Sequence, residues 1–461
     1  MLKLLLGASG SGKTTLLYQR IRARAEAGGR SILLVPEQFT SSTEGRIHRE
    51  LGDALSGLVE SFSFTSLAEH ILSAEGGSAV QTLSDAGRAV LVRRALEELQ
   101  DNVHYYYRHR RSAAFCQMAA ETIDELKSAG LSGQRLYALA QECGADSAKL
   151  SELALIFQGY ETLLAGTGMD PSDRLTLAAS RLENALARGG LPEFLRGREV
   201  FIDEFDTFNA PKKRLMGALL ASLPTVTVAL CDDGAPLIPG DMSLFSGAKQ
   251  VAAQLRQLAR RSGTEVAVPE LLRRDMRHAD APGLAAAARL LASGQCDPPP
   301  ACPEIKLFAA SSREEEARAA AAAIRRLMRQ GVRCGRVAVV CRDIAKYRAA
   351  VRYEFRMADI PLYCDEPTTP EFSAPATAVR CLLAIARGAE LTEQLTTLAK
   401  TGLCALTEEE VCALENYAYT WSPGAAAWRA PFEKNPRGFG DADPTAEDTE
   451  NLARAEKARA L

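Results

Sequence analysis

The stretch "LLLGASGSGKTTLL", Leu4–Leu17, decides the fold. Gly7, four further residues and then Gly12-Lys13-Thr14 form a complete Walker A pattern, preceded by apolar residues that suit a buried strand and followed by a helix-forming run. Glycines let backbone N–H groups face a phosphate, and the N-terminus of the helix adds positive potential. The pattern therefore predicts an ATP site made of the loop residues Gly7, Ala8, Ser9, Gly10, Ser11, Gly12, Lys13, Thr14 and Thr15.

The chemistry of such a loop also requires a magnesium site. Lys13 is expected to reach the β- and γ-phosphates, and the Thr14 hydroxyl to ligate Mg²⁺. The second ligand is expected at the end of a neighbouring strand, where Asp203 follows three apolar residues in "VFIDEF". Glu204, beside it, occupies the position at which many ATPases keep the base that orients the attacking water. The alternative is an acidic strand end that binds no metal.

The rest of the first 295 residues alternates short apolar strands with helices. This alternation predicts an α/β fold with a parallel sheet covered on both faces. The expected strands are Leu2–Leu6, Ser31–Val35, Val59–Phe62, Arg198–Asp203 and Thr225–Cys231. Between about residues 77 and 190 the strand signal is replaced by helices, the first of them capped by Ser84. We therefore expect one α/β domain, residues 1–295, interrupted by a helical insertion.

A second domain is expected after a proline-rich linker at residues 296–303. Residues 304–372 begin a new α/β pattern, with strands at Ile305–Ala309 and Arg336–Cys341 and helices that end at Arg329 and Met357. Residues 373–461 are again helical, and the chain stops within a helical pattern without a cap or breaker. We interpret this last part as a truncated helical insertion of a longer protein.

Composition limits the class of protein. The 461 residues carry a net charge of −3 with 47% hydrophobic residues, and no apolar run approaches the roughly 18 residues of a membrane span. The 11 cysteines include no CxxC pair, which favours reduced thiols in a cytoplasmic protein over a metal site. DNA binding would have to use local basic patches. "HYYYRHRR", His104–Arg111, is such a candidate, or else a solvated helix end or loop.

The placement of a helical block between Lys13 and Asp203 resembles superfamily 1 DNA helicases of the UvrD type. Two features of those helicases are absent here. Only six residues precede Gly7, which leaves no room for their adenine-binding glutamine motif, and "DEFDTFNAPKK" after the strand contains no glutamine. Arg342 follows the strand pattern "VAVVC", where those helicases hold an arginine that senses the γ-phosphate. The resemblance implies P-loop, RecA-like domains with helical insertions.

Longer stretches are similar to the AddB family, one of the two components of the bacterial AddAB ATP-dependent helicase–deoxyribonuclease. They are "ILLVPEQFTSSTE", "VESFSFTSLAEHIL", "ETIDELKSAGLSGQRL", "VFIDEFDTF" and "YRAAVRYEFRMADIPLYCDEP". The resemblance implies a part in processing double-strand breaks for recombinational repair. It also implies an AddA-like partner, single- and double-stranded DNA as ligands, and a nuclease domain with an iron–sulfur cluster in a C-terminal part that this chain lacks.

In that family the helicase-like channel reads the Chi sequence on single-stranded DNA. Amides and hydroxyls can read base edges, and aromatic rings can stack on unpaired bases. The positions that match are Gln38, Thr40, Phe64, Phe205 and Phe208. The phenylalanines have apolar neighbours, so core positions are the alternative. Ser66 and Glu69 stand where the family pattern has an arginine and an aromatic residue.

Three functions remain open from the sequence. The first is an AddB-like fragment that binds ATP and single-stranded DNA and hydrolyses little ATP alone. The second is an autonomous helicase motor, for which Glu204 is the best argument. The third is a nucleotide-gated scaffold that docks the AddA-like partner.

Overall fold

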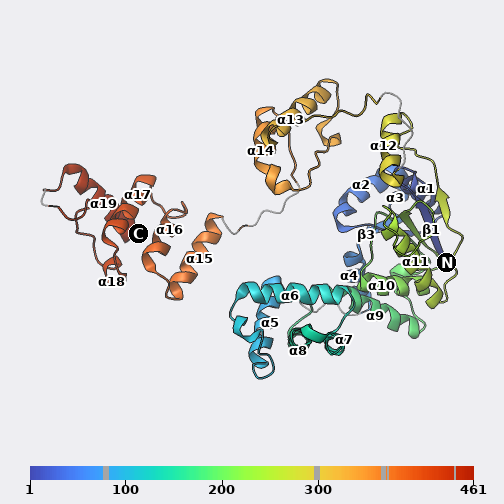
Figure 1. Cartoon of the computed structure of the whole chain (residues 1–461), viewed down its shortest axis with the longest axis horizontal. Coiled ribbons are helices and arrows are strands. Elements are labelled where there is room, and N and C mark those ends of the chain that lie inside the picture. Colours follow the sequence, from blue (N-terminus) through green and yellow to red (C-terminus); the bar gives the residue numbers. More distant parts are fainter. Residues whose placement is uncertain (76–81, 295–301, 365–369, 371–372, 441–442) are drawn as a thin grey trace. The chain divides into compact units, whose positions relative to one another are not determined.

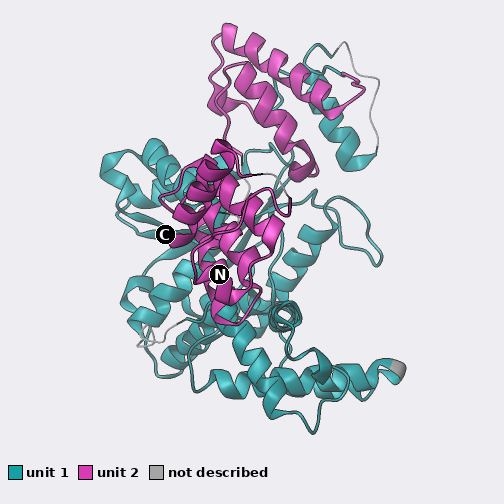
Figure 2. Cartoon of the chain, turned by 90° about the vertical axis from the view of Figure 1, so that its left-hand side faces the viewer, with its two compact units in different colours: residues 1–307 teal, residues 308–461 magenta. Residues whose placement is uncertain are grey.

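The computed structural model describes residues 1–75, 82–294, 302–364, 370, 373–440 and 443–461. The chain divides into two compact units, Met1–Leu307 and Phe308–Leu461 (Figure 2). The expected linker at 296–303 and the expected start of the insertion near 77 fall largely outside the described residues.

The first unit is built on a six-stranded sheet in which every strand pairing is parallel. The strand order is β3-β2-β4-β5-β1-β6. The strands are β1 (Leu2–Gly7), β2 (Ser31–Leu34), β3 (Val59–Phe62), β4 (Glu199–Ile202), β5 (Val226–Cys231) and β6 (Glu270–Leu272). The expected α/β fold with a parallel sheet is confirmed, and β6 is an addition to the five expected strands.

Helices cover both faces of this sheet, as the continuous apolar strands require. Alternate residues of β1 point to opposite faces. Leu4 packs on the face covered by α4 (Phe64–Ala74), α9 (Arg174–Ala187), α10 (Ala210–Ser222) and α11 (Ser246–Arg261). Leu5 packs on the other face, under α1 (Lys13–Glu26), α2 (Thr40–Leu51) and the short α3 (Asp53–Ser56). The phosphate-loop helix α1 is therefore held by the core from its first turn.

The helical insertion forms a lobe with a core of its own (Figure 1). It consists of α5 (Asp85–Glu98), α6 (Ala113–Ser128), α7 (Gly133–Ala140) and α8 (Ser147–Leu164). The Ser84 hydroxyl accepts the Gly87 N–H at the start of α5, which confirms the expected cap. A buried polar cluster ties the lobe to the start of α9: Asp170 accepts hydrogen bonds from Lys127 Nζ (2.9 Å) and from the Tyr160 hydroxyl (2.8 Å). The unit ends with α12 (Pro282–Ser293).

The second unit contains helices but no strand among its described residues. Helices α13 (Arg313–Arg329) and α14 (Ile344–Met357) are confirmed and share a small core. The strands expected at 305–309 and 336–341 are wrong, because a strand needs a hydrogen-bonded neighbour and neither segment has one here. Leu307 is 100% exposed and Val340 is 91% exposed.

The remaining described residues confirm the expected helical character of 373–461. The helices are α15 (Ala374–Ala386), α16 (Leu391–Ala399), α17 (Glu408–Trp421), α18 (Ala425–Trp428) and α19 (Ala446–Ala460). Tyr417, Trp428 and Phe432 are at the centre of their core. In the part of the chain that the structure describes, no helix has the length and apolar character that crossing a bilayer requires.

Candidate nucleotide-binding site

The phosphate loop is a tight turn between β1 and α1. Gly10 (φ 83°) and Gly12 (φ 88°) adopt left-handed conformations that favour glycine. A Cβ atom at Gly7 would lie 2.4 Å from Ser11 Oγ, so the close approach of the chain also requires glycine there. Gly12 gives α1 no side-chain cap, and the first turn of the helix has no acidic residue. The N–H groups of that turn are therefore free of side-chain competition for an anion.

Lys13 and Ser11 fit the loop to a phosphate. Lys13 Nζ donates to the carbonyl oxygens of Gly7 (2.7 Å) and Ala8 (2.9 Å), which keeps the ammonium at the mouth of the loop. Burial lowers the pKa of Lys13. Ser11 Oγ is buried and makes no hydrogen bond within the described structure, an arrangement that costs free energy. A phosphate oxygen would accept from both groups.

The two expected magnesium ligands lie together. Asp203 follows β4 directly and is buried. Burial raises the pKa of Asp203, while hydrogen bonds from the Thr14 hydroxyl and the Glu204 N–H (3.0 Å to Oδ1) act in the opposite direction. A hydroxyl beside a buried carboxylate is the oxygen pair that Mg²⁺ binds through one or two ligands and phosphate. The donor set therefore fits the ion.

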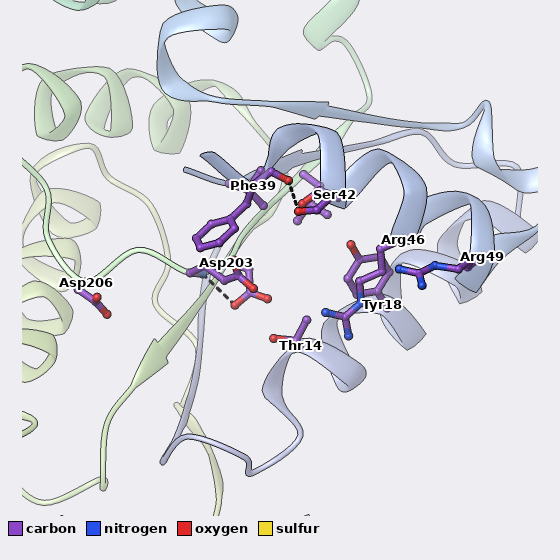
Figure 3. Close-up of a pocket in the computed structure, with 12 residues that line it drawn as sticks. Thr14, Tyr18, Phe39, Ser42, Arg46, Arg49, Asp203 and Asp206 are labelled. Carbon is purple, nitrogen blue, oxygen red and sulfur yellow. Dashed lines mark hydrogen bonds between the residues drawn. The ribbon is translucent and has the colours of Figure 1, made fainter. Parts of the chain in front are cut away.

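Glu204 lines a cavity of about 470 Å³ next to these ligands (Figure 3). Its backbone has φ 65°, and burial, together with the charge of Asp203, raises the pKa of its carboxyl. The cavity is lined by residues of α1, α2, β2 and the segment after β4: Thr14, Tyr18, Leu33, Val35, Phe39, Ser42, Thr43, Arg46, Arg49, Asp203, Glu204 and Asp206. The carboxylate expected to position water therefore faces open space, not the core.

Arg46 brings a positive charge to this cavity that was not expected from the sequence. Its guanidinium lies 4.7 Å from the centre of the Tyr18 ring. Its charge is one of the smaller influences that lower the pKa of Asp203 and Glu204. In Figure 3 both Arg46 and Arg49 extend from α2 along the same side of the cavity. Because α2 begins at Thr40, one helix links the cavity to the residues expected to read DNA.

Arg277 is a second site residue that sequence reasoning missed. Its Nη1 lies 3.1 Å from Ser9 Oγ, and its N–H donates to the Gly10 carbonyl oxygen (3.2 Å). Asp275 fixes the turn by accepting the N–H groups of Arg277 and His278, each at 3.1 Å. The guanidinium is thus held over the loop. No local motif marks this arginine, because it comes from a segment far along the chain.

The five residues expected to contact DNA do not form one exposed face. Gln38 is exposed and Thr40 is half-buried, in the short segment between β2 and α2. The rings of Phe64, Phe205 and Phe208 are 2%, 8% and 5% exposed. They pack together in the core, with the Phe64 centroid 5.1 Å from Phe205 and 5.8 Å from Phe208. The core alternative describes their position here, and a DNA contact by these rings stays a prediction that requires them to leave it.

Three other residues singled out in the sequence have clear positions. Ser66 completes a capping box with Ser63 at the start of α4. Glu69 forms an ion pair with Arg174. Arg342 is exposed in the second unit, and its contact with a γ-phosphate stays a prediction.

Comparison with known proteins identifies the family. The model of the N-terminal region of AddB matches residues 4–286, which is more than half of the chain. The chain belongs to the AddB family. Similar proteins are the B-type subunits of the ATP-dependent helicase/deoxyribonucleases of Moorella thermoacetica and Desulforudis audaxviator, each 31% identical over 93% of this chain. That of Geobacillus kaustophilus is 30% identical over 79%.

This AddB-family chain is shorter than those relatives. It spans 38% of the Moorella protein and 37% of the Desulforudis protein. The match to the family model begins at β1 and includes the loop, Asp203 and Arg277. All the elements that form the nucleotide cavity therefore lie in the family's N-terminal region.

Proposed function

We propose that this chain is the N-terminal region of an AddB-like protein that binds Mg·ATP and single-stranded DNA in a helicase–exonuclease that processes double-strand breaks. The observation that carries the nucleotide part is one assembly: an uncapped helix start, Lys13, the unpartnered Ser11 hydroxyl, and Thr14 beside Asp203. We further propose that residues 1–295 are a P-loop RecA-like domain, that residues 304–372 begin a second one, and that 373–461 are an insertion.

Each loop residue has a distinct task in binding. The N–H groups at the start of α1 orient the phosphates, and Lys13 neutralises their charge. Thr14 and Asp203 would hold Mg²⁺, which supplies charge neutralisation at the phosphate oxygens. Arg277 reaches the loop from the opposite side to the helix, so we expect it to contact a phosphate oxygen. Glu204 faces the cavity beside the expected position of the metal.

Hydrolysis by this chain alone is expected to be slow or absent. Arg277 supplies one cation, but the adenine glutamine motif is missing and Arg342 belongs to the other unit. A missing arginine finger typically costs about 10³–10⁵ in turnover. We therefore propose nucleotide binding as the principal role of the site.

The DNA part of the proposal rests on the segment between β2 and α2. Gln38 is exposed, and Phe39 beside it is 36% exposed and lines the nucleotide cavity. The relatives are named as B-type subunits of a multi-subunit enzyme, so for this chain we propose an AddA-like partner and both single- and double-stranded DNA as ligands. The iron–sulfur cluster is expected only in the remainder of a full-length AddB, and the location is expected to be cytoplasmic.

Two measurements on the purified chain separate the three candidate functions. An AddB-like binding region should bind a labelled single-stranded oligonucleotide and Mg·ATP, with little turnover. DNA-stimulated turnover of about 1 s⁻¹ or more, the usual range for enzymes, would favour the motor instead. Nucleotide binding without any DNA binding would favour the scaffold.

A further inference from the structure

The segment His104–Arg111, which joins α5 to α6, is held in a fixed conformation by the carboxylate of Glu152 on α8. Glu152 accepts the backbone N–H groups of His104 (3.0 Å), Tyr105 (2.9 and 2.8 Å) and Tyr106 (3.1 Å). Three successive N–H groups around one anion form the type of concave backbone site called a nest. The acid that neighbours the segment is therefore committed to its backbone.

Apolar packing fixes the same segment from beneath. Val103, which precedes it, is fully buried. The Tyr106 ring stacks on Phe115 of α6, with centroids 5.6 Å apart. Side chains on such a base lose less conformational entropy on binding than those on a mobile loop. The "HYYYRHRR" segment is a rigid mount for its exposed side chains and not a frayed helix end.

The arginines of this segment carry uncompensated charge. Arg108, Arg110 and Arg111 form no ion pair with any described residue. Arg108 Nε donates to His109, and Arg110 lies over the Tyr107 ring at 4.0 Å. In contrast, two arginines on the adjacent helix α5 are each paired with a glutamate one turn later. The positive charge is thus concentrated in the segment.

An exposed aromatic ring lies among these charges. Tyr105 is 46% exposed, with the Arg108 guanidinium 6.0 Å and Lys149 Nζ 5.4 Å from its ring centre. Unpaired arginines contact phosphates, and an aromatic ring can stack on a base or pack on a sugar. An acidic protein surface would use the charges but would give the ring no comparable partner.

We propose that His104–Arg111, with Lys149, is a DNA-contact surface that binds the phosphodiester backbone. It is separate from the nucleotide cavity, because α5–α8 contribute no residue to that cavity. It is also separate from the Gln38–Thr40 segment. The insertion would then hold DNA in register without reading its sequence.

The test compares two double variants of the whole chain that remove equal charge. Arg108→Gln/Arg111→Gln removes charges from the surface, and Arg93→Gln/Arg94→Gln removes them from the paired positions on α5. DNA affinity is measured over a range of salt concentrations with one labelled oligonucleotide, both single-stranded and as a blunt duplex. Each lost phosphate contact lowers the slope of log K against log salt by about 0.7 for a single strand and about 0.9 for a duplex.

We expect the first variant to lose about one to two contacts' worth of slope on at least one probe, with an unchanged melting temperature, and the control to keep the wild-type slope. The probe that responds identifies the form of DNA that is bound. Equal slopes for wild type and the first variant on both probes would overturn the proposal, as would an equal loss in the control. Tighter binding to polyglutamate than to either DNA would also overturn it and indicate an acidic protein partner. Nucleotide affinity, measured in parallel, reports on the proposed function independently.

Discussion

The guanidinium of Arg277 lies 3.1 Å from the Ser9 hydroxyl, although the two residues are 268 positions apart in the sequence. The contact places a permanent positive charge on the phosphate loop. That charge is one of the influences that lower the pKa of Lys13, after the larger effect of burial. Two cations at such close range are held together most favourably when an anion lies between them. The relationship thus supports a phosphate at this position.

Replacing Arg277 should weaken binding of nucleotides that carry several phosphates. A hydrogen bond to a charged group contributes about 1.5–3 kcal/mol, so Arg277→Gln should reduce ATP affinity roughly 10- to 100-fold and change AMP affinity much less. Titration calorimetry with both nucleotides measures this. Arg274→Gln, at an exposed arginine of the same segment, is the control. Equal affinities for ATP in the two variants would rule out a phosphate contact by Arg277.

Asp203→Asn should separate stability from metal binding. Burial raises the folded-state pKa of Asp203, so its ionised form costs stability at pH values above the ordinary pKa of 3.8. The variant should therefore melt at a higher temperature than wild type at neutral pH, and this gain should shrink as the pH falls toward that value. Mg·ADP should raise the melting temperature of wild type only. A variant that melts lower than wild type at neutral pH would contradict the sign.

Phe64→Ala should destabilise the chain, because the ring is buried between Phe205 and Phe208. Core Phe→Ala changes cost about 3–5 kcal/mol, which lowers the melting temperature by several degrees. The exposed Phe39→Ala is the matched control and should melt like wild type. If Phe64 also reaches DNA by leaving the core, the folded fraction should lose about 1–3 kcal/mol of affinity. Unchanged affinity would leave Phe64 with a core role alone.

Gln38→Ala should weaken single-stranded DNA binding without affecting stability. The side chain is exposed, and a neutral hydrogen bond contributes about 0.5–1.5 kcal/mol, so we expect a roughly 2- to 12-fold loss in fluorescence anisotropy titrations. Ser41→Ala, at the neighbouring exposed position, should bind like wild type. A normal affinity for Gln38→Ala would remove this segment from the DNA-binding surface.

The fold was largely predictable where local pattern decides it. The strand at Val59–Phe62 and the helix at Ile344–Met357 have the expected limits, because periodicity and caps are local signals. β6 was missed because it is three residues long and directly follows Pro269. The strand expected at 305–309 failed for the opposite reason. Its sequence suits a strand, but pairing depends on a neighbour that no local pattern specifies.

The candidate site divides in the same way. The contact between Thr14 and Asp203 could be predicted, since a Walker A loop requires a carboxylate at the end of a nearby strand. Arg46 and Arg277 could not, because each reaches the site through the packing of a distant segment. Burial of Phe64 also depends on tertiary structure, because a ring at the start of a helix can face the core or the solvent equally well.

The central claim is that the loop binds nucleotide phosphates through Lys13, and titration calorimetry of Mg·ATP with wild type and Lys13→Ala tests it most directly. The wild-type chain should bind, and the variant should lose at least about 10-fold in affinity, because a charge-assisted contact to the phosphates is removed. Both proteins should have the same melting temperature without ligand. Equal Mg·ATP affinity for wild type and Lys13→Ala, or no binding by wild type, would contradict the account.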